Sequence, residues 1–476
     1  MTHPESVLVW FRLDLRLADH PALNAAVATG LPIVPVFIWS PEEEGDGAPG
    51  AASRWWLHQS LLRLDESLKQ KGSRLVVRRG PVAEALASLA AEANAHRVFR
   101  NRVYEPAALE REAGLAETLQ SRGVAIESFN GSLLFDPGSI RTTTGGSFHV
   151  FTPFWRALWN ARGGLRSPIK APAEMRAPAL WPESLAVAEL DLEPKIDWAK
   201  GIREAWTPGE EGARTRLRAF VKGAVSHYGD ERDRTDHEGT SRLSPHLHFG
   251  EISPVRLWEA ACDRAGAESY LRQLAWREFA NHLLVEHPES ITEPLNPQFR
   301  NFPWHSNSRW LRAWQRGRTG YPFVDAGMRE LWATGWMHNR ARLVVASFLV
   351  KHLLIPWQDG AAWFMDTLVD ADLANNTMGW QWVAGCGVDA APYFRIFNPI
   401  VQGEKFDPGG EYVRRWIPEL RGLAAEWIHQ PWNAPPLVLA AAAVTLGKSY
   451  PFPLVDHSEA RAAALSAFAT LKSGRG

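Results

Sequence analysis

The sequence predicts two domains of different class: an N-terminal α/β domain built on a doubly wound parallel sheet, and a C-terminal domain that is all-helical. Three observations carry this prediction. The length of 476 residues exceeds what one hydrophobic core usually serves. Short β-branched runs alternate with amphipathic segments over residues 1–132, and strand signals nearly vanish after Trp206.

The N-terminal elements follow one another as strand, helix, strand. We expect strands at 7–10, 33–38, 74–78, 97–99 and 124–126, and helices at 54–69, 82–93 and 106–120. Strands and helices in this order form right-handed βαβ crossovers, which predicts a Rossmann-like sheet over residues 1–132. No Gly-x-Gly-x-x-Gly follows the first strand, so nothing supports dinucleotide binding of the usual kind.

Proline, glycine and serine interrupt the next stretch, which shows no sustained period. We therefore expect residues 133–198 to be a long connector lying over the surface. Residues 199–476 form the predicted helical domain. Helical periodicity marks 212–228, 254–265, 269–286, 321–334, 339–354 and 361–373.

Composition narrows the class of protein. Hydrophobic residues at 45% and charged residues at 22% are typical of a soluble globular chain. Two cysteines, Cys262 and Cys386, are too few for a disulfide framework, a four-cysteine zinc site or a four-cysteine iron–sulfur cluster, so we predict no metal site and a reducing, cytoplasmic location. No signal peptide or run of 18 apolar residues is present, which argues against secretion and membrane insertion.

One stretch, 370–382, concentrates polar and aromatic chemistry. It holds two acids, three amides and two tryptophans, more than a helix needs merely to pack, although a tryptophan-rich core helix is an alternative for this segment alone. Segments 335–342 and 390–399 have a similar density of amide, guanidinium and aromatic groups. Together the three segments predict a polar, aromatic ligand site.

Two further segments favour anions. Segment 238–245 combines glycine, hydroxyl side chains and a helix start, which suits a pyrophosphate, while Thr240 or Ser244 could equally be a plain helix cap. Segment 300–318 contains five arginines without an acid. Four aromatic residues, Phe302, Trp304, Trp310 and Trp314, lie among them. Contact with DNA phosphates is one interpretation, and a solvated basic face is the other. The net charge of −1 means that any DNA binding depends on such local clusters.

Over nearly its whole length the chain resembles the photolyase/cryptochrome family. The resemblance rests on segments 10–16, 238–245, 335–342, 370–382 and 397–406. Within the family it looks like the class III enzymes for cyclobutane pyrimidine dimers (CPDs), because of 376–378 and 383–387. Gln273 stands where many class I enzymes have a glutamate, and Asn339 where (6-4) photolyases carry a second histidine, which leaves His338 without that partner.

The resemblance implies FAD as cofactor. The implied FAD-binding residues are Tyr228, Thr240, Ser241, Arg242, Leu243, Ser244, Tyr270, Arg342, Asp370, Asp372 and Asn376. Asn376 faces the flavin N5 in this interpretation, and an amide there can donate to N5 or accept from N5–H. A core ion pair between Arg342 and Asp370 is the structural alternative for those two residues. Three tryptophans, Trp380, Trp357 and Trp304, match the family's electron-transfer chain, with packing as the alternative role.

The resemblance also implies a lesion site. The implied catalytic residues are Asn376, Trp276, Trp382, Gln273 and Asn339, with Trp276 and Trp382 sandwiching a flipped-out dimer. The implied DNA-binding residues are Arg232, Trp276, Arg340, Trp382, Arg395 and Gln402.

The activity that the resemblance implies is that of a deoxyribodipyrimidine photo-lyase, in which photoexcited reduced FAD donates an electron to a CPD in DNA. A monomer is expected. Ala108 stands where folate-binding class I enzymes have a glutamate, so their antenna site cannot simply be carried over. Methenyltetrahydrofolate is still preferred over deazaflavin as antenna, bound partly by residues 42–55. The alternatives are a cryptochrome photoreceptor without repair activity and a flavin electron-transfer protein that does not bind DNA.

Overall fold

The computed structural model describes residues 5–389 and 394–473, so part of the 390–399 motif lies outside the described residues. Contacts divide the chain into two compact units. The first comprises Met1–Gly229, Ser241–Pro288 and Val369–Ala374, and the second comprises Asp230–Thr240, Glu289–Leu368 and Asn375–Gly476.

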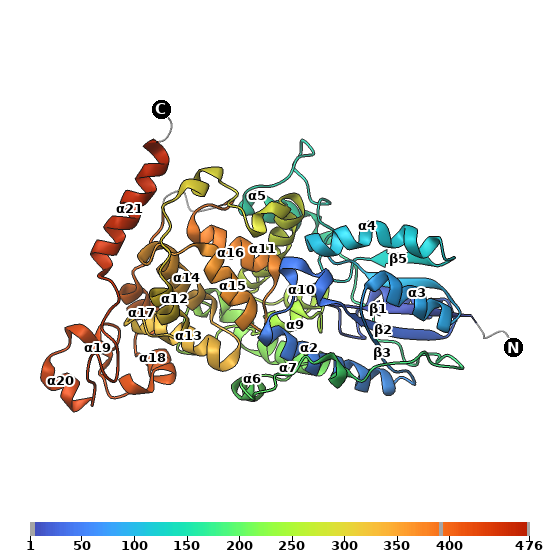
Figure 1. Ribbon diagram of the computed structural model, residues 1–476, viewed down its shortest axis with the longest axis horizontal. Coiled ribbons are helices and arrows are strands. Elements are labelled where there is room, and N and C mark those ends of the chain that lie inside the picture. The colour runs from blue at the N-terminus through green and yellow to red at the C-terminus, as the bar shows by residue number, and fades with distance from the viewer. Residues whose placement is uncertain (1–4, 390–393, 474–476) are drawn as a thin grey trace. The chain divides into compact units, whose positions relative to one another are not determined.

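The first unit contains a five-stranded sheet in which every neighbouring pair is parallel (Figure 1). Its order is β3-β2-β1-β4-β5, with β1 Ser6–Phe11, β2 Ile33–Trp39, β3 Val76–Arg79, β4 Ala95–Asn101 and β5 Ala125–Phe129. The central strand β1 is buried along its whole length, which explains its continuous apolar sequence. The predicted α/β class is confirmed.

Side-chain alternation along the strands supplies both faces of the sheet. Leu8 and Trp10 of β1 join Leu86 and Leu89 of α3 (Val82–Glu92) and Leu119 of α4 (Pro106–Gln120) in one core. The residues between them point to the opposite face. Helix α1 (Pro21–Ala28) contacts β1 and β4 but contributes nothing to that core, so helices cover both faces, as a doubly wound fold requires.

The connector contains a helix that the sequence analysis missed, α5 (Phe151–Ala161). Its buried residues are Phe151, Phe154, Trp155 and Leu158, a helical spacing of i, i+3, i+4 and i+7. Pro153 obscured this pattern, although proline is compatible with the first turn of a helix, because a backbone N–H there would have no intrahelical acceptor and its loss costs no hydrogen bond.

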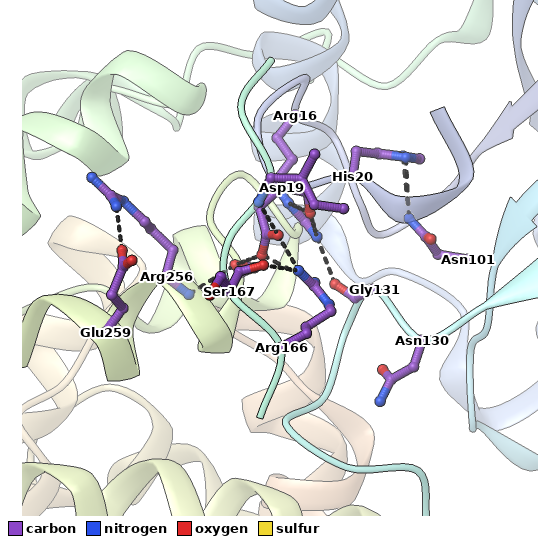
Figure 2. A network of polar contacts seen from close by, with 12 residues as sticks. Arg16, Asp19, His20, Asn101, Asn130, Gly131, Arg166, Ser167, Arg256 and Glu259 are labelled. Atoms are coloured by element: carbon purple, nitrogen blue, oxygen red, sulfur yellow. Dashed lines mark hydrogen bonds and ion pairs between the residues drawn. The ribbon is translucent and has the colours of Figure 1, made fainter. Parts of the chain in front are cut away.

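The rest of the connector is anchored through Asp19, whose backbone is left-handed (φ 54°) in the turn before α1. Figure 2 shows Arg166 facing the Asp19 carboxylate: its Nη1 donates to Oδ1, and its Nη2 donates to Oδ2 at 3.1 Å. Ile169 N donates to Asp19 Oδ1 at 2.9 Å, and Asp19 N donates back to Ile169 O at 2.7 Å. Although burial acts to raise it, hydrogen bonds from Arg166 and Ser253 leave the pKa of Asp19 below its usual value.

Beyond β5 the described residues form helices and turns, with one isolated bridge between Leu446 and Tyr450, which confirms the predicted all-helical region. The helices are α6 Lys200–Ala205, α7 Glu210–Lys222, α8 Tyr228–Glu231, α9 Ser244–His248, α10 Pro254–Ala261, α11 Glu268–Glu286, α12 Ser308–Gln315, α13 Pro322–Thr334, α14 Asn339–Ser347, α15 Trp357–Thr367, α16 Leu373–Ala384, α17 Pro399–Phe406, α18 Glu411–Trp416, α19 Ala425–Ile428, α20 Pro436–Ala441 and α21 His457–Ser473. Within the described residues, no helix is both long and apolar enough to cross a membrane.

Three predicted helices differ from those observed. The expected helix at 212–228 ends at Lys222, and a 3-10 turn, Ala224–His227, separates it from α8. The expected helix at 339–354 is α-helical only to Ser347 and continues as a π-helix, Phe348–His352. The expected helix at 361–373 begins earlier, at Trp357, and ends at Thr367. The short segment between α15 and α16 carries Asp370, so this acid lies on irregular backbone, the usual location of ligand-binding groups.

Candidate FAD and lesion site

Two predicted cofactor residues of the first unit, Tyr228 and Tyr270, belong to a cluster of three aromatic rings. The rings of Tyr228 and Tyr270 meet edge-on at 5.4 Å and 80°, and both contact Phe220 of α7. The Tyr270 hydroxyl is buried beside Ser241 and makes no hydrogen bond of normal geometry to the described residues. Burial raises its pKa, so this hydroxyl remains a neutral donor.

Segment 241–244 is not a plain helix cap. The N-cap of α9 is Leu243, no side chain caps it, and Ser244 is already the first helical residue. Arg242 adopts a left-handed backbone with φ 50°, and its guanidinium carbon lies 4.6 Å from the Trp206 ring centroid. A non-glycine residue in this conformation costs about 1–2 kcal/mol and often marks a functional site.

The two acids before α16 lie close to α9 within the same unit. Asp372 N donates to Asp370 O at 2.8 Å, and Asp372 Oδ2 lies 3.9 Å from His248 Nδ1 at the end of α9. Desolvation, followed by the charges of Asp372 and Glu44, raises the pKa of Glu105 to about 8. Asp372 therefore lies near enough to Glu105 for its negative charge to disfavour ionisation of that buried carboxyl.

In the second unit, the packing of α16 on α15 fixes the predicted redox residues. Asn376 Nδ2 donates to Ala361 O at 3.0 Å, which directs the amide oxygen away from that carbonyl. Trp380 is buried, contacts Trp314 at 6.2 Å and lies so close to Gly360 that a Cβ there would be 2.1 Å from Trp380 Cη2. Trp357 begins α15 and is also buried.

Two more predicted residues of the second unit, the electron-transfer residue Trp304 and the FAD-binding residue Arg342, also make specific contacts. Trp304 is half-buried and contacts Phe302 at 4.3 Å. Arg342 Nε donates to Met337 O at 2.8 Å.

Trp276, a predicted lesion-binding residue of the first unit, is half-buried, and its ring is fixed by stacking on a neighbouring ring. Its ring stacks on Phe151 at 3.6 Å and 8°, and Phe279 meets it edge-on at 5.9 Å. Gln273 Nε2 donates to Ser269 O at 3.2 Å. Phe151 lies on α5, so the sequence analysis, having missed that helix, also missed this support.

Arg340 organises the predicted DNA-binding residues of the second unit. It donates to Asp233 Oδ2 at 2.6 Å and lies 4.3 Å from the ring centroid of Phe406 at the end of α17. Arg232 Nε lies 3.8 Å from Asp233 Oδ1, so Arg232 and Arg340 share one acid. The other predicted DNA-binding residues of this unit are the half-buried Trp382 and Gln402 and the exposed Arg395. Asn339, predicted as a catalytic residue, is also exposed.

The arginine-rich segment is only partly as expected. Arg309, Arg312, Arg316 and Arg318 are exposed. Trp314, however, is completely buried and donates to Val345 O at 3.0 Å, and Phe302 is also in the core. These two aromatic residues therefore pack inside the protein, and of the four only Trp304 and Trp310 are partly exposed.

Comparison with known proteins agrees with this geometry. Residues 7–173 match the family described as DNA photolyase, and residues 270–470 match the FAD binding domain of DNA photolyase. The chain is 48% identical to a deoxyribodipyrimidine photo-lyase of Agrobacterium fabrum, over 98% of both chains. The chain belongs to the photolyase/cryptochrome family.

Two further family members are instructive. Cryptochrome-1 of Arabidopsis thaliana is 42% identical over 96% of this chain and 69% of its own. The crystal structure of a bacterial class III photolyase from Agrobacterium tumefaciens superposes with a TM-score of 0.95, at 46% identity and with 99% of both chains covered. The resemblance to class III photolyases is therefore confirmed.

The described residues fit the FAD that this photolyase family binds. The buried Tyr270 hydroxyl beside Ser241 and the left-handed backbone of Arg242 are the features of this segment that suit a bound polar ligand. Of the predicted FAD-binding residues, the first unit contains Tyr228, Ser241, Arg242, Leu243, Ser244, Tyr270, Asp370 and Asp372, and the second contains Thr240, Arg342 and Asn376.

His338 cannot act as a general acid near neutral pH in this photolyase-family protein. Burial lowers its pKa to about 4; the charge of Asp233 opposes this shift, and those of Arg340 and Arg342 add to it. Its Nδ1 accepts from Arg340 N at 3.2 Å and caps α14. His338 is therefore a neutral imidazole near pH 7 whose Nδ1 serves as a helix cap.

The same shift predicts acid sensitivity. The folded pKa of His338 lies below the unfolded value, so its contribution to stability is present above about pH 6.5 and is lost as pH falls toward 4. Asparagine is a good N-cap without a titratable ring. Between pH 7 and 5, the unfolding free energy of wild type should therefore fall by about 2 kcal/mol more than that of His338→Asn. Urea unfolding at the two pH values measures this difference. Parallel pH dependences would contradict the shift.

Proposed function

We propose that the protein repairs cyclobutane pyrimidine dimers in DNA with light. The carrying observation is Trp276, a half-exposed indole that Phe151 holds flat at 3.6 Å. A rigid aromatic face suits a base that has left the duplex, and photolyases are themselves a standard example of enzymes that act on a flipped-out base. The similarity to proteins named deoxyribodipyrimidine photo-lyase supports this assignment.

The lesion site needs stacking and phosphate contacts. We assign stacking on the dimer to Trp276 and Trp382. Gln273, whose Nε2 is engaged by Ser269, presents its carbonyl oxygen as an acceptor for a thymine N–H. Arg232 and Arg340 bind the DNA backbone, with Arg395 and Gln402 beside them and Asn339 at the exposed edge.

The predicted flavin residues have two roles: some bind FAD, and others set the chemistry of its ring. When bound, reduced and photoexcited, FAD supplies the electron that splits the dimer. Tyr228, Tyr270 and segment 240–244 hold the cofactor, while Arg342, Asp370 and Asp372 bind its polar ring and ribityl atoms. Asn376 is oriented by Ala361 so that its oxygen accepts a hydrogen bond, the role expected beside a protonated N5. Trp380, Trp357 and Trp304 relay electrons to the cofactor.

We assign an antenna chromophore, methenyltetrahydrofolate, to the α/β domain of residues 1–132. Segment 42–55 includes two short 3-10 turns, Pro41–Glu43 and Gly45–Gly47, and Arg111 binds Glu44 at 2.7 Å. Ala108 is completely buried, so a contact from this position like that of the class I glutamate is not expected. We further propose residues 133–198 as connector, 199–476 as catalytic domain, and a cytoplasmic monomer.

The rival function is a photoreceptor, favoured by the 42% identity with Arabidopsis cryptochrome-1. One experiment separates the two. The reduced protein is illuminated with oligonucleotides carrying either a CPD or a (6-4) product, and recovery of thymine absorbance is followed. Recovery with the CPD alone supports repair. No recovery with either lesion would favour signalling, and recovery with the (6-4) product would overturn the substrate assignment.

A further inference from the structure

Glu251, between α9 and α10, is a completely buried carboxylate to which no role in flavin or lesion binding has been assigned above. Its Oε1 accepts from Trp56 Nε1 at 3.0 Å, from Gly209 N at 2.7 Å and from Ser60 Oγ. Its Oε2 pairs with Nδ1 of His246, which is also completely buried. Four donors therefore converge on one side chain.

These donors come from three separate segments of the first unit. Trp56 and Ser60 lie on α2 (Ala51–Lys69), Gly209 precedes α7, and His246 lies on α9. The Trp56 ring also meets His246 edge-on at 5.2 Å and lies nearly parallel to Phe249 at 6.0 Å. Glu251 is thus the polar link by which α9 is attached to α2.

Helix α9 needs such an attachment, because it has five residues and a single turn has little stability of its own. The chain immediately before it is segment 241–244, and its last residue, His248, lies 3.9 Å from Asp372. We propose that Glu251 is a positioning residue for FAD, which acts through His246 to hold segment 241–244 in its binding conformation. The proposal rests on the assignment of that segment to the cofactor.

Glutamine is the informative conservative replacement. Its carbonyl oxygen can accept from the same three donors as Oε1, and its amide can donate to the unprotonated Nδ1 of the other His246 tautomer. Alanine, in contrast, leaves every donor buried without an acceptor. A positioning role therefore predicts that glutamine largely preserves FAD affinity and that alanine does not.

The second unit offers a matched control in Asp325. It too is completely buried and accepts four hydrogen bonds: from Thr319 N and Thr319 Oγ1 at 2.7 Å each, from Gly320 N at 3.0 Å, and from Tyr450 Oη at 2.6 Å. None of these donors belongs to segment 240–248. Asp325→Ala should reproduce the loss of global stability without the loss of positioning.

The test measures the FAD dissociation constant of the full chain, well below the melting temperature of every variant. We expect Glu251→Ala to raise this constant at least about tenfold, and Glu251→Gln and Asp325→Ala to change it less than about threefold. Wild-type affinity in Glu251→Ala would overturn the proposal, as would an equal loss in Asp325→Ala.

Two additional variants keep the outcome clear. If Glu251→Ala does not fold, the pair Trp56→Phe and Ser60→Ala removes two donors from α2 without altering α9, and unchanged FAD affinity there would overturn the proposal. Ser241→Ala tests the segment itself: weaker FAD binding in Ser241→Ala with wild-type binding in Glu251→Ala would overturn positioning alone. These experiments measure FAD binding and not dimer repair. A failure of the repair assignment would therefore leave their outcome unchanged.

Discussion

Replacing Trp276 with alanine is expected to weaken binding of CPD-containing DNA about tenfold to a hundredfold, because stacking of a base on an aromatic ring is worth about 1–3 kcal/mol. The structure adds that the ring is preorganised by Phe151 at 3.6 Å, so little entropy is lost when a base stacks on it. The measurement is a titration of labelled oligonucleotides with and without a dimer, at one fixed salt concentration.

Trp159 provides the control for this experiment. It is also half-buried and lies on α5, but it contacts Arg162 and Trp258 and not Trp276. Trp159→Ala should therefore leave the affinity for the dimer near that of wild type. A loss in Trp276→Ala that is equal for damaged and undamaged DNA would mean that Trp276 supports general binding and does not recognise the lesion.

Trp380→Phe is expected to slow light-driven reduction of the bound flavin at least about tenfold, equivalent to about 1.4 kcal/mol on the barrier, while sparing repair by enzyme reduced beforehand. A phenyl ring retains packing on Gly360 and Phe364 but is much harder to oxidise than indole. Flavin absorbance under blue light measures the first rate, and single-flash repair of a dimer by prereduced protein measures the second.

Trp363→Phe is the matched control, since Trp363 also lies on the α15 side of this unit but stacks on the exposed Trp332. Its photoreduction should match that of wild type. If Trp380→Phe lost photoreduction and repair together, Trp380 would be mainly a packing residue. An unchanged rate would mean that another indole, with Trp314 at 6.2 Å as the nearest candidate, carries the electron.

Several strands and helices could be predicted because each leaves a periodic pattern in its own stretch of sequence. The continuous apolar run of β1 and the spacing of α3 and α4 depend on each strand or helix burying its own face. Helix α5 was missed because Pro153 interrupts the helical pattern of the sequence, although in the first turn it does not interrupt the helix itself. The end of α15 at Thr367 was missed because residues 368–373 are apolar enough to continue its period.

The sequence by itself determined the fold class, the family and the types of side chain at the cofactor and lesion, since these follow from periodicity and from motifs in a fixed order. Tertiary structure decided which of those residues pack and which are presented. Trp314 and Phe302 went into the core, Phe151 came from the connector to support Trp276, and Glu251 gathered donors from α2, α7 and α9. The physical reason is that burial and hydrogen-bond partners depend on contacts between segments far apart in the chain, which no local pattern records.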